Sequence, residues 1–178
     1  MCGDIKVKSR THLQALMLKI ALTIIIVDQI TKVIAVATLE NRNNLILVPA
    51  LLGDRVGPLL QFNFIRNPGA AFGFGTNATL IFTILAFVIS IIIWKTGNKI
   101  ENKFWAICFG ALLGGAIGNL IDRIFRSPGV FRGAVVDFVQ IPYWAIFNVA
   151  DMAVSISATI IAIMSLMGKD PYKKKLND

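Results

Sequence analysis

Histidine and cysteine are nearly missing from this chain of 178 residues, which contains one histidine and two cysteines. The histidine, His12, stands before or at the start of the first apolar run, so a histidine-based metal site or a Ser-His triad is excluded in practice. Cys108 lies deep in an apolar run and Cys2 is terminal, so we expect no disulfide between them. Any catalysis must therefore depend on other side chains.

Charge is also scarce. Only 16% of the residues are charged, 56% are hydrophobic and the mean hydropathy is +0.70, which excludes a soluble domain of this length and indicates a membrane protein. The net charge of +8 and the pI of about 9.8 raise the possibility of a nucleic-acid partner. The basic residues form no stripe with interleaved aromatic residues, so we expect no nucleic-acid binding.

Four apolar runs have about the 20 residues needed to cross a bilayer: 13–37, 78–95, 104–124 and 145–167. We therefore predict an all-α membrane protein, a four-helix bundle in one domain over residues 1–178. The long connection 38–77 contains the runs "LILVPALL" and "PLLQFNFI" with turn signals between and after them. These runs predict short strands at the membrane surface.

The lysines and arginines between the runs predict the orientation. One side of the membrane collects mainly lysines, at Lys6, Lys8, Arg10, Lys19, Lys95, Lys99, Lys103, Lys169, Lys173, Lys174 and Lys175. The other side has only arginines, at Arg42, Arg55, Arg66, Arg126 and Arg132. By the positive-inside rule both termini are cytoplasmic, and the loops 38–77 and 125–144 face outward.

The first run has one alternative interpretation. A basic region, an apolar run and "AVA" at 35–37 resemble a cleavable secretory signal. The apolar stretch continues past Asp28 and Lys32, beyond the roughly 7–15 residues of such a signal, which favours a permanent span.

Seven charged or amide side chains inside the spans fall at one depth, near the outer face. They are Asp28, Lys32, Asn119, Asp122, Arg123, Asn148 and Asp151. Ionisable groups in a membrane cluster where they pair with one another or line a wet cavity. Two interpretations stay open for Asp28 with Lys32, and for Asp122 with Arg123 or a neighbouring helix: structural ion pairs, or parts of a functional site.

Glycines in the third run predict close helix packing. Gly110, Gly114 and Gly118 recur every four residues, and small residues in such rows let helix backbones touch. Gly115 lies in the adjacent row with Asn119 and Arg123, where we expect it to clear space under these polar groups.

Two aspartates have the surroundings of a catalytic pair. Asp151 interrupts the apolar run "IFNVADMAVSIS", where an ionised carboxylate costs at least roughly 3 kcal/mol. Asp137, in "GAVVDFVQIPYW", lies on a short strand or turn before the fourth span. Two carboxylates about 3 Å apart cannot both ionise, so one keeps a proton while the other activates water, as in aspartic proteases. Asn148 shares a helix face with Asp151 and is suited to orient a carboxylate.

Five motifs then resemble one family, lipoprotein signal peptidase, also called signal peptidase II. They are "DQITK" at 28–32, "NPGAAFG" at 67–73, "GGAIGNLIDR" at 114–123, "GAVVDF" at 133–138 and "FNVADMAVSIS" at 147–157. Each motif alone is weak, but their order and their places relative to the four spans make the resemblance specific and extend it nearly end to end.

The resemblance implies that Asp137 and Asp151 are catalytic. The positions that it implies for substrate contact or support of the two aspartates are Asp28, Lys32, Asn67, Gly115, Asn119, Arg123 and Asn148. It implies a substrate, the diacylglyceryl-modified prolipoprotein of bacteria, cut just before its lipidated cysteine, and an enzyme of the inner membrane with its active site near the outer face. We expect no metal or other cofactor, contact with membrane lipid, and a monomer.

Two other classes of function compete with a peptidase. A small proton-coupled transporter also buries carboxylates, but it places them near the midplane of repeated halves, and this sequence has no repeat. An accessory membrane subunit has no need of both Asp137 and Asp151, so replacing each of them separates that class from an enzyme.

Overall fold

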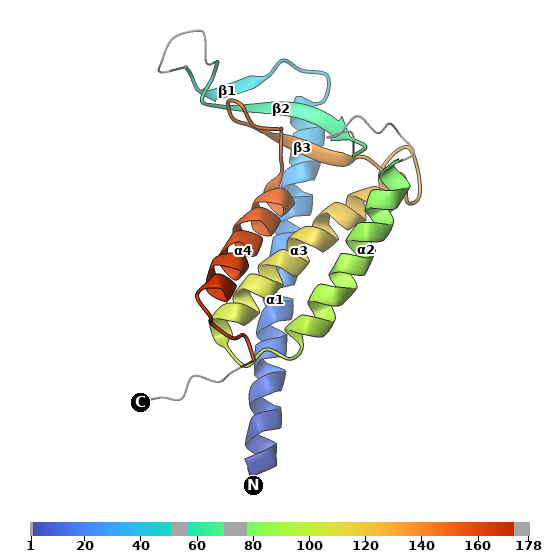
Figure 1. The fold of residues 1–178 in the computed structure, drawn as a ribbon. Helices are drawn as coiled ribbons and strands as arrows, with labels where there is room; N and C mark the ends of the chain where they lie inside the picture. The colour runs from blue at the N-terminus through green and yellow to red at the C-terminus, as the bar shows by residue number, and fades with distance from the viewer. Residues whose placement is uncertain (1, 51–56, 70–77, 173–178) are drawn as a thin grey trace.

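The computed structural model of the chain describes residues 2–50, 57–69 and 78–172. Four helices lie side by side as a bundle, and a three-stranded sheet lies across one end of it (Figure 1). In chain order the elements are α1 Cys2–Leu39, β1 Leu45–Val48, β2 Leu60–Asn67, α2 Ala78–Gly97, α3 Lys103–Phe125, β3 Val135–Gln140 and α4 Val149–Leu166.

All four helices contain a segment long and apolar enough to cross a membrane: Thr11–Leu39, Thr79–Gly97, Lys103–Phe125 and Val149–Leu166. These segments confirm the predicted four-helix membrane fold. α1 begins at Cys2, well before the predicted position 13, because hydropathy marks an apolar stretch and not the end of a helix.

The start of α4 differs from the prediction. The helix begins at Val149 and not at 145, because the preceding residues join the sheet region: Phe147 and Val139 exchange backbone hydrogen bonds of 2.8 and 2.9 Å. Asn148 then caps the helix in a reciprocal capping box with Asp151. Asp151 therefore lies in the first turn of α4.

The sheet is antiparallel in the order β1-β2-β3. β1 lies in the first apolar run of the 38–77 connection, and β2 lies in the second and continues past it to Asn67. β3 comes from the segment between α3 and α4, and it pairs Asp137 with Ile65 and Val135 with Asn67 across the sheet. This pairing joins residues about 70 positions apart in the chain and places the end of β2 beside Asp137.

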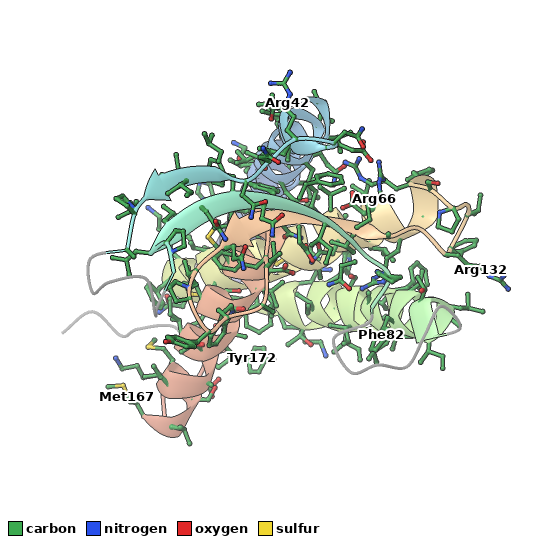
Figure 2. The ribbon with its side chains drawn as sticks, turned by 90° about the horizontal axis from the view of Figure 1, so that it is seen from above. Arg42, Arg66, Phe82, Arg132, Met167 and Tyr172 are labelled. Atoms are coloured by element: carbon green, nitrogen blue, oxygen red, sulfur yellow. The ribbon has the colours of Figure 1, made fainter. Side chains whose placement is uncertain are left out.

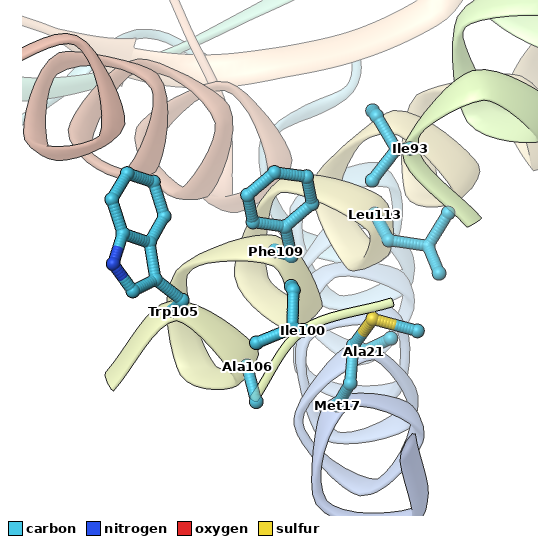
Figure 3. Close-up of a cluster of buried hydrophobic side chains, with 8 residues drawn as sticks. All are labelled: Met17, Ala21, Ile93, Ile100, Trp105, Ala106, Phe109 and Leu113. Carbon is cyan, nitrogen blue, oxygen red and sulfur yellow. The ribbon is translucent and has the colours of Figure 1, made fainter. Parts of the chain in front are cut away.

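Two apolar clusters hold the elements together. One lies at the end of the bundle away from the sheet (Figure 3) and consists of Met17, Ala21, Ile93, Ile100, Trp105, Ala106, Phe109 and Leu113. The other joins α1 to the sheet and consists of Ala35, Leu39, Val136 and Phe138. α3 packs against each of the other three helices, so it is the central helix of the bundle.

The glycine row of α3 packs closely against another helix, as predicted, and the structure shows that this helix is α1. A Cβ atom on Gly110 would lie 2.6 Å from the carbonyl oxygen of Met17, and one on Gly114 would lie 2.7 Å from that of Ala21. Real Cβ atoms do not approach other atoms this closely, so only glycine allows the two backbones to come together.

Candidate active site

Asp137 is the third residue of β3, and only 1% of it is exposed. Asn67, the last residue of β2, donates from Nδ2 to Oδ2 of Asp137 at 2.9 Å. Asn148 donates from Nδ2 to Oδ1 at 2.6 Å. Burial raises the pKa of Asp137 to about 6, although both amide hydrogen bonds oppose the rise; the charge of Asp151 adds to it. Asp137 is therefore a carboxyl group that holds a proton more tightly than an ordinary aspartate.

Asp151 lies in the first turn of α4 and accepts two hydrogen bonds. Asn119 of α3 donates from Nδ2 to its Oδ1 at 2.7 Å, and the backbone N–H of Asn148 donates to its Oδ2 at 3.2 Å. The capping box supplies the second bond, so the turn that begins α4 also holds this carboxylate in place.

Asn148 connects the two aspartates. Its Nδ2 donates to Asp137, while its Oδ1 accepts the backbone N–H of Asp151 at 2.9 Å. One buried amide therefore bonds to both residues and sets β3 against the start of α4. The predicted span 145–167 places Asn148 inside the fourth helix. In the structure Asn148 is instead the N-cap, because α4 begins at Val149.

A buried lysine lies at the centre of a second layer of the site. Lys32 is 0% exposed and its Nζ is 2.9 Å from Oδ2 of Asp28 and 2.9 Å from Oδ2 of Asp122. It also donates to Oδ1 of Asn119 at 2.9 Å. Because Lys32 donates to the amide oxygen of Asn119, the amide nitrogen of Asn119 is directed toward Asp151.

The two carboxylates bound by Lys32 each hold a piece of backbone. Asp28 accepts the N–H of Ala150 in α4 at 2.9 Å, and Asp122 accepts the N–H of Val136 in β3 at 3.1 Å. Ala150 precedes Asp151 and Val136 precedes Asp137. The charged cluster therefore fixes the backbone beside both aspartates, from helices α1 and α3.

Sequence reasoning missed two members of this cluster, Gln29 and Arg126. Gln29 donates to Oδ1 of Asp122 at 3.2 Å and to the carbonyl oxygen of Gly118 at 3.1 Å. Arg126 pairs with Oδ1 of Asp122 at 2.6 Å. The spacing of four residues between Asp122 and Arg126 was the available signal. Among the described residues, the ion-pair partners of Asp122 are thus Lys32 and Arg126.

Nη1 of Arg123 is buried and has no hydrogen-bond partner in the described part of the chain. Its guanidinium lies over the ring of Phe82 in α2, with the carbon Cζ 5.8 Å from the ring centre. A buried N–H without an acceptor is costly, and an oxygen placed beside it would remove that cost.

Asn67 ends β2, and its Oδ1 also accepts the backbone N–H of Gly69 at 2.9 Å, which fixes the amide. Gly115 is placed differently from the expectation. A Cβ atom on Gly115 would lie 2.5 Å from the carbonyl oxygen of Ala150. Gly115 therefore allows α3 to touch the first turn of α4, rather than clearing space under Asn119. Residues 70–73 of the "NPGAAFG" motif lie outside the described residues.

Within the described ranges, no group of three or more histidine, cysteine, aspartate or glutamate side chains could hold a metal ion. The chemistry available to the site is that of two carboxyl groups, the amides that bond to them and the guanidinium of Arg123.

The fold and the site define a class first: a multi-pass membrane protein with two aspartates held together where its sheet meets its spanning helices. A family model described as "Signal peptidase (SPase) II" matches residues 20–167. The chain therefore belongs to the signal peptidase II family of proteases, and the resemblance seen in the motifs is confirmed.

Individual relatives agree with the family match. The chain is 46% identical over 155 residues to the lipoprotein signal peptidase of Streptomyces griseus, covering 87% of this chain and 75% of that protein. It is 38% identical over 162 residues to the lipoprotein signal peptidase of Rhodococcus jostii, covering 90% and 78%. A solved bacterial membrane enzyme superposes with a TM-score of 0.72 at 28% identity, covering 91% of this chain and 94% of that one.

Proposed function

We propose that this protein is an aspartic endopeptidase that removes the signal peptide of bacterial prolipoproteins, cutting just before the diacylglyceryl-modified cysteine. The observation that carries the proposal is that Asp137 and Asp151, from separate elements, both bond to Asn148. The names of the relatives, lipoprotein signal peptidase, supply the class of substrate.

The two carboxyl groups divide the proton work. In this mechanism Asp137, whose pKa burial raises to about 6, carries the shared proton, and Asp151 acts as the base that accepts a proton from water. The water oxygen attacks the scissile carbonyl carbon, and the proton of Asp137 passes to the carbonyl oxygen. When the tetrahedral intermediate collapses, the C–N bond breaks and Asp151 returns its proton to the leaving amine, while Asp137 recovers its own.

The amides and Arg123 support this reaction in different ways. Asn119, Asn148 and Asn67 hold the carboxyl groups in place by the hydrogen bonds described above. Arg123 Nη1 donates to an oxygen of the bound peptide, because it lacks an acceptor among the described residues. Such a donor favours charge that develops on the carbonyl oxygen.

The lipid of the substrate explains the place of the site. With both termini in the cytoplasm, the sheet and the two aspartates lie at the outer face of the inner membrane. A diacylglyceryl group on the cysteine keeps its acyl chains in the outer leaflet, so the peptide bond before that cysteine arrives at the same depth. Burial of the acyl chains, worth about 0.8 kcal/mol per CH₂, makes the lipid the main source of recognition.

The dyad is tested by Asp137→Asn and Asp151→Asn in purified enzyme, with cleavage of a diacylglyceryl-modified prolipoprotein followed by gel shift. We expect each variant to lose cleavage while its thermal unfolding shows a folded protein, because one carboxyl group cannot serve as both acid and base. Asp170→Asn, an exposed aspartate near the described C-terminal end, is the matched control and should keep full activity. Substantial cleavage by either folded variant would refute the proposal and favour an accessory role.

The substrate is tested separately with the same prolipoprotein lacking its diacylglyceryl group. We expect cleavage of the lipidated form alone. Equal cleavage of both forms would leave an aspartic peptidase without lipid recognition.

A further inference from the structure

A groove that the proposed reaction does not use lies between the end of α1 and the sheet. Its volume is about 490 Å³, within the usual range of small-molecule sites. Its lining residues are Thr31, Ile34, Ala35, Thr38, Leu39, Arg42, Asn43, Asn44, Leu45, Phe62 and Phe138.

The groove is separate from the two aspartates. Successive side chains of a strand point to opposite faces, so Phe138 and Asp137 face away from each other. Phe138 packs with Ala35 and Leu39 of α1 and lines the groove, while Asp137 bonds Asn67 and Asn148. A molecule in the groove would therefore meet the back of β3 and leave the reacting groups free.

The polar side chains of the groove other than Thr31 and Thr38 gather at one rim, and those two hydroxyls donate to backbone carbonyls of α1. α1 ends at Leu39, and the three residues Arg42, Asn43 and Asn44 follow in the exposed turn before β1. The walls below are mainly aliphatic and aromatic, from α1 and from Phe62 and Phe138. The groove is thus apolar along the spanning helix and polar where that helix leaves the membrane.

Arg42 supplies an available positive charge at this rim. It is exposed at the end of α1 (Figure 2), and among the described residues no carboxylate pairs with it. The nearby carboxylate of Glu40 is already paired with Arg66 at 2.8 Å, so it adds little repulsion toward an anion. Arginine binds phosphate oxygens through its planar fork. The side-chain amides of Asn43 and Asn44, which also line the groove, can add further donors.

We propose that this groove is a binding site for an anionic glycerophospholipid of the bilayer. One acyl chain lies against Ile34, Thr38 and Phe62, and the headgroup phosphate bonds to Arg42. The groove has an apolar wall at membrane depth, and at its polar rim lies Arg42, which has no carboxylate partner among the described residues. This is the order of groups in a phospholipid. The bound lipid would hold the sheet against α1 from the side opposite the two aspartates.

The test is native mass spectrometry of the full-length protein in detergent, titrated with phosphatidylglycerol or phosphatidylcholine. We expect one retained molecule, with phosphatidylglycerol preferred. Arg42→Ala should weaken phosphatidylglycerol binding about tenfold, the loss expected for a charge-assisted hydrogen bond, with little effect on phosphatidylcholine. Arg132→Ala removes another exposed arginine, in the 125–133 loop (Figure 2), and should bind as the wild type does.

A second pair of variants tests the groove itself. Thr38→Trp fills it and should abolish retention of both lipids, while Leu22→Trp, an exposed position on the same helix outside the groove, should leave retention unchanged. Ile34→Trp replaces Thr38→Trp if the latter does not fold. Unchanged binding by the folded groove variant, or equal losses in the Arg42 and Arg132 variants, would overturn the proposal.

The prolipoprotein assay separates a lipid site from a substrate site. We expect KM for the lipidated substrate to stay unchanged in Arg42→Ala and Thr38→Trp. A raised KM with unchanged lipid retention would mean that the groove takes part of the substrate, which overturns the phospholipid proposal and leaves the aspartate mechanism standing.

Discussion

Lys32→Met should destabilise the protein strongly, because Lys32 is the shared cation of two buried carboxylates. Its Nζ lies 2.9 Å from both Asp28 and Asp122, and all three side chains are fully buried. Asp122 keeps Arg126 at 2.6 Å, so the loss falls mainly on Asp28. Removing one partner of a buried pair costs about 3–5 kcal/mol, since it leaves a charge without compensation.

The assay is thermal unfolding of purified protein in detergent. A loss of that size corresponds to a Tm lower by roughly 6–20 °C, at about 2–4 °C per kcal/mol for a chain of this length. Lys99→Met, which removes an exposed lysine between α2 and α3, should change Tm little.

A double variant tests whether Lys32 and Asp28 share the buried charge. In Lys32→Met with Asp28→Asn, a neutral amide replaces the stranded carboxylate and its oxygen can still accept the N–H of Ala150. We expect the double variant to be more stable than Lys32→Met alone, a coupling that independent sites would not show. A Tm unchanged in Lys32→Met, or a double variant whose losses simply add, would refute a shared buried charge.

Three further predictions concern the site and its orientation. The kcat for lipidated prolipoprotein should fall as pH rises through about 6, where Asp137 loses its proton. Asn67→Ala should move this fall in kcat to higher pH, because the hydrogen bond that it removes favours the ionised form of Asp137. The same pH profile in Asn67→Ala and wild type would contradict this role of Asp137. Arg123→Lys should lower turnover more than expression, because lysine keeps the charge but lacks the planar fork; wild-type kcat in that variant would remove Arg123 from the site. In a background without native cysteines, Asn44→Cys should react with an impermeant maleimide on intact cells and Lys99→Cys only after permeabilisation; the reverse pattern would invert the topology.

The main architecture could be predicted from the sequence because the bilayer imposes it locally. A span needs a run of about 20 apolar residues, and each run can be recognised without knowledge of the others. The same holds for Asp28 and Lys32, whose spacing of four residues places them on one helix face and whose ion pair the structure contains.

Only the tertiary structure decided how the polar residues are bonded to one another. α4 begins at Val149 and not at the predicted 145, because Phe147 pairs with β3 and Asn148 caps the helix. Hydropathy detects neither the strand pairing nor the cap. The spacing in the chain offers no signal that Lys32 of α1 bonds Asn119 of α3.

Gly115 shows the same limit. The sequence shows that Gly115 shares a face of α3 with Asn119 and Arg123. It does not show that this face meets α4, where Gly115 lies against the carbonyl oxygen of Ala150. Periodicity states which residues share a face of one helix. Which faces then meet depends on the packing of four helices and a sheet together, and that packing joined Asn148 to Asp137.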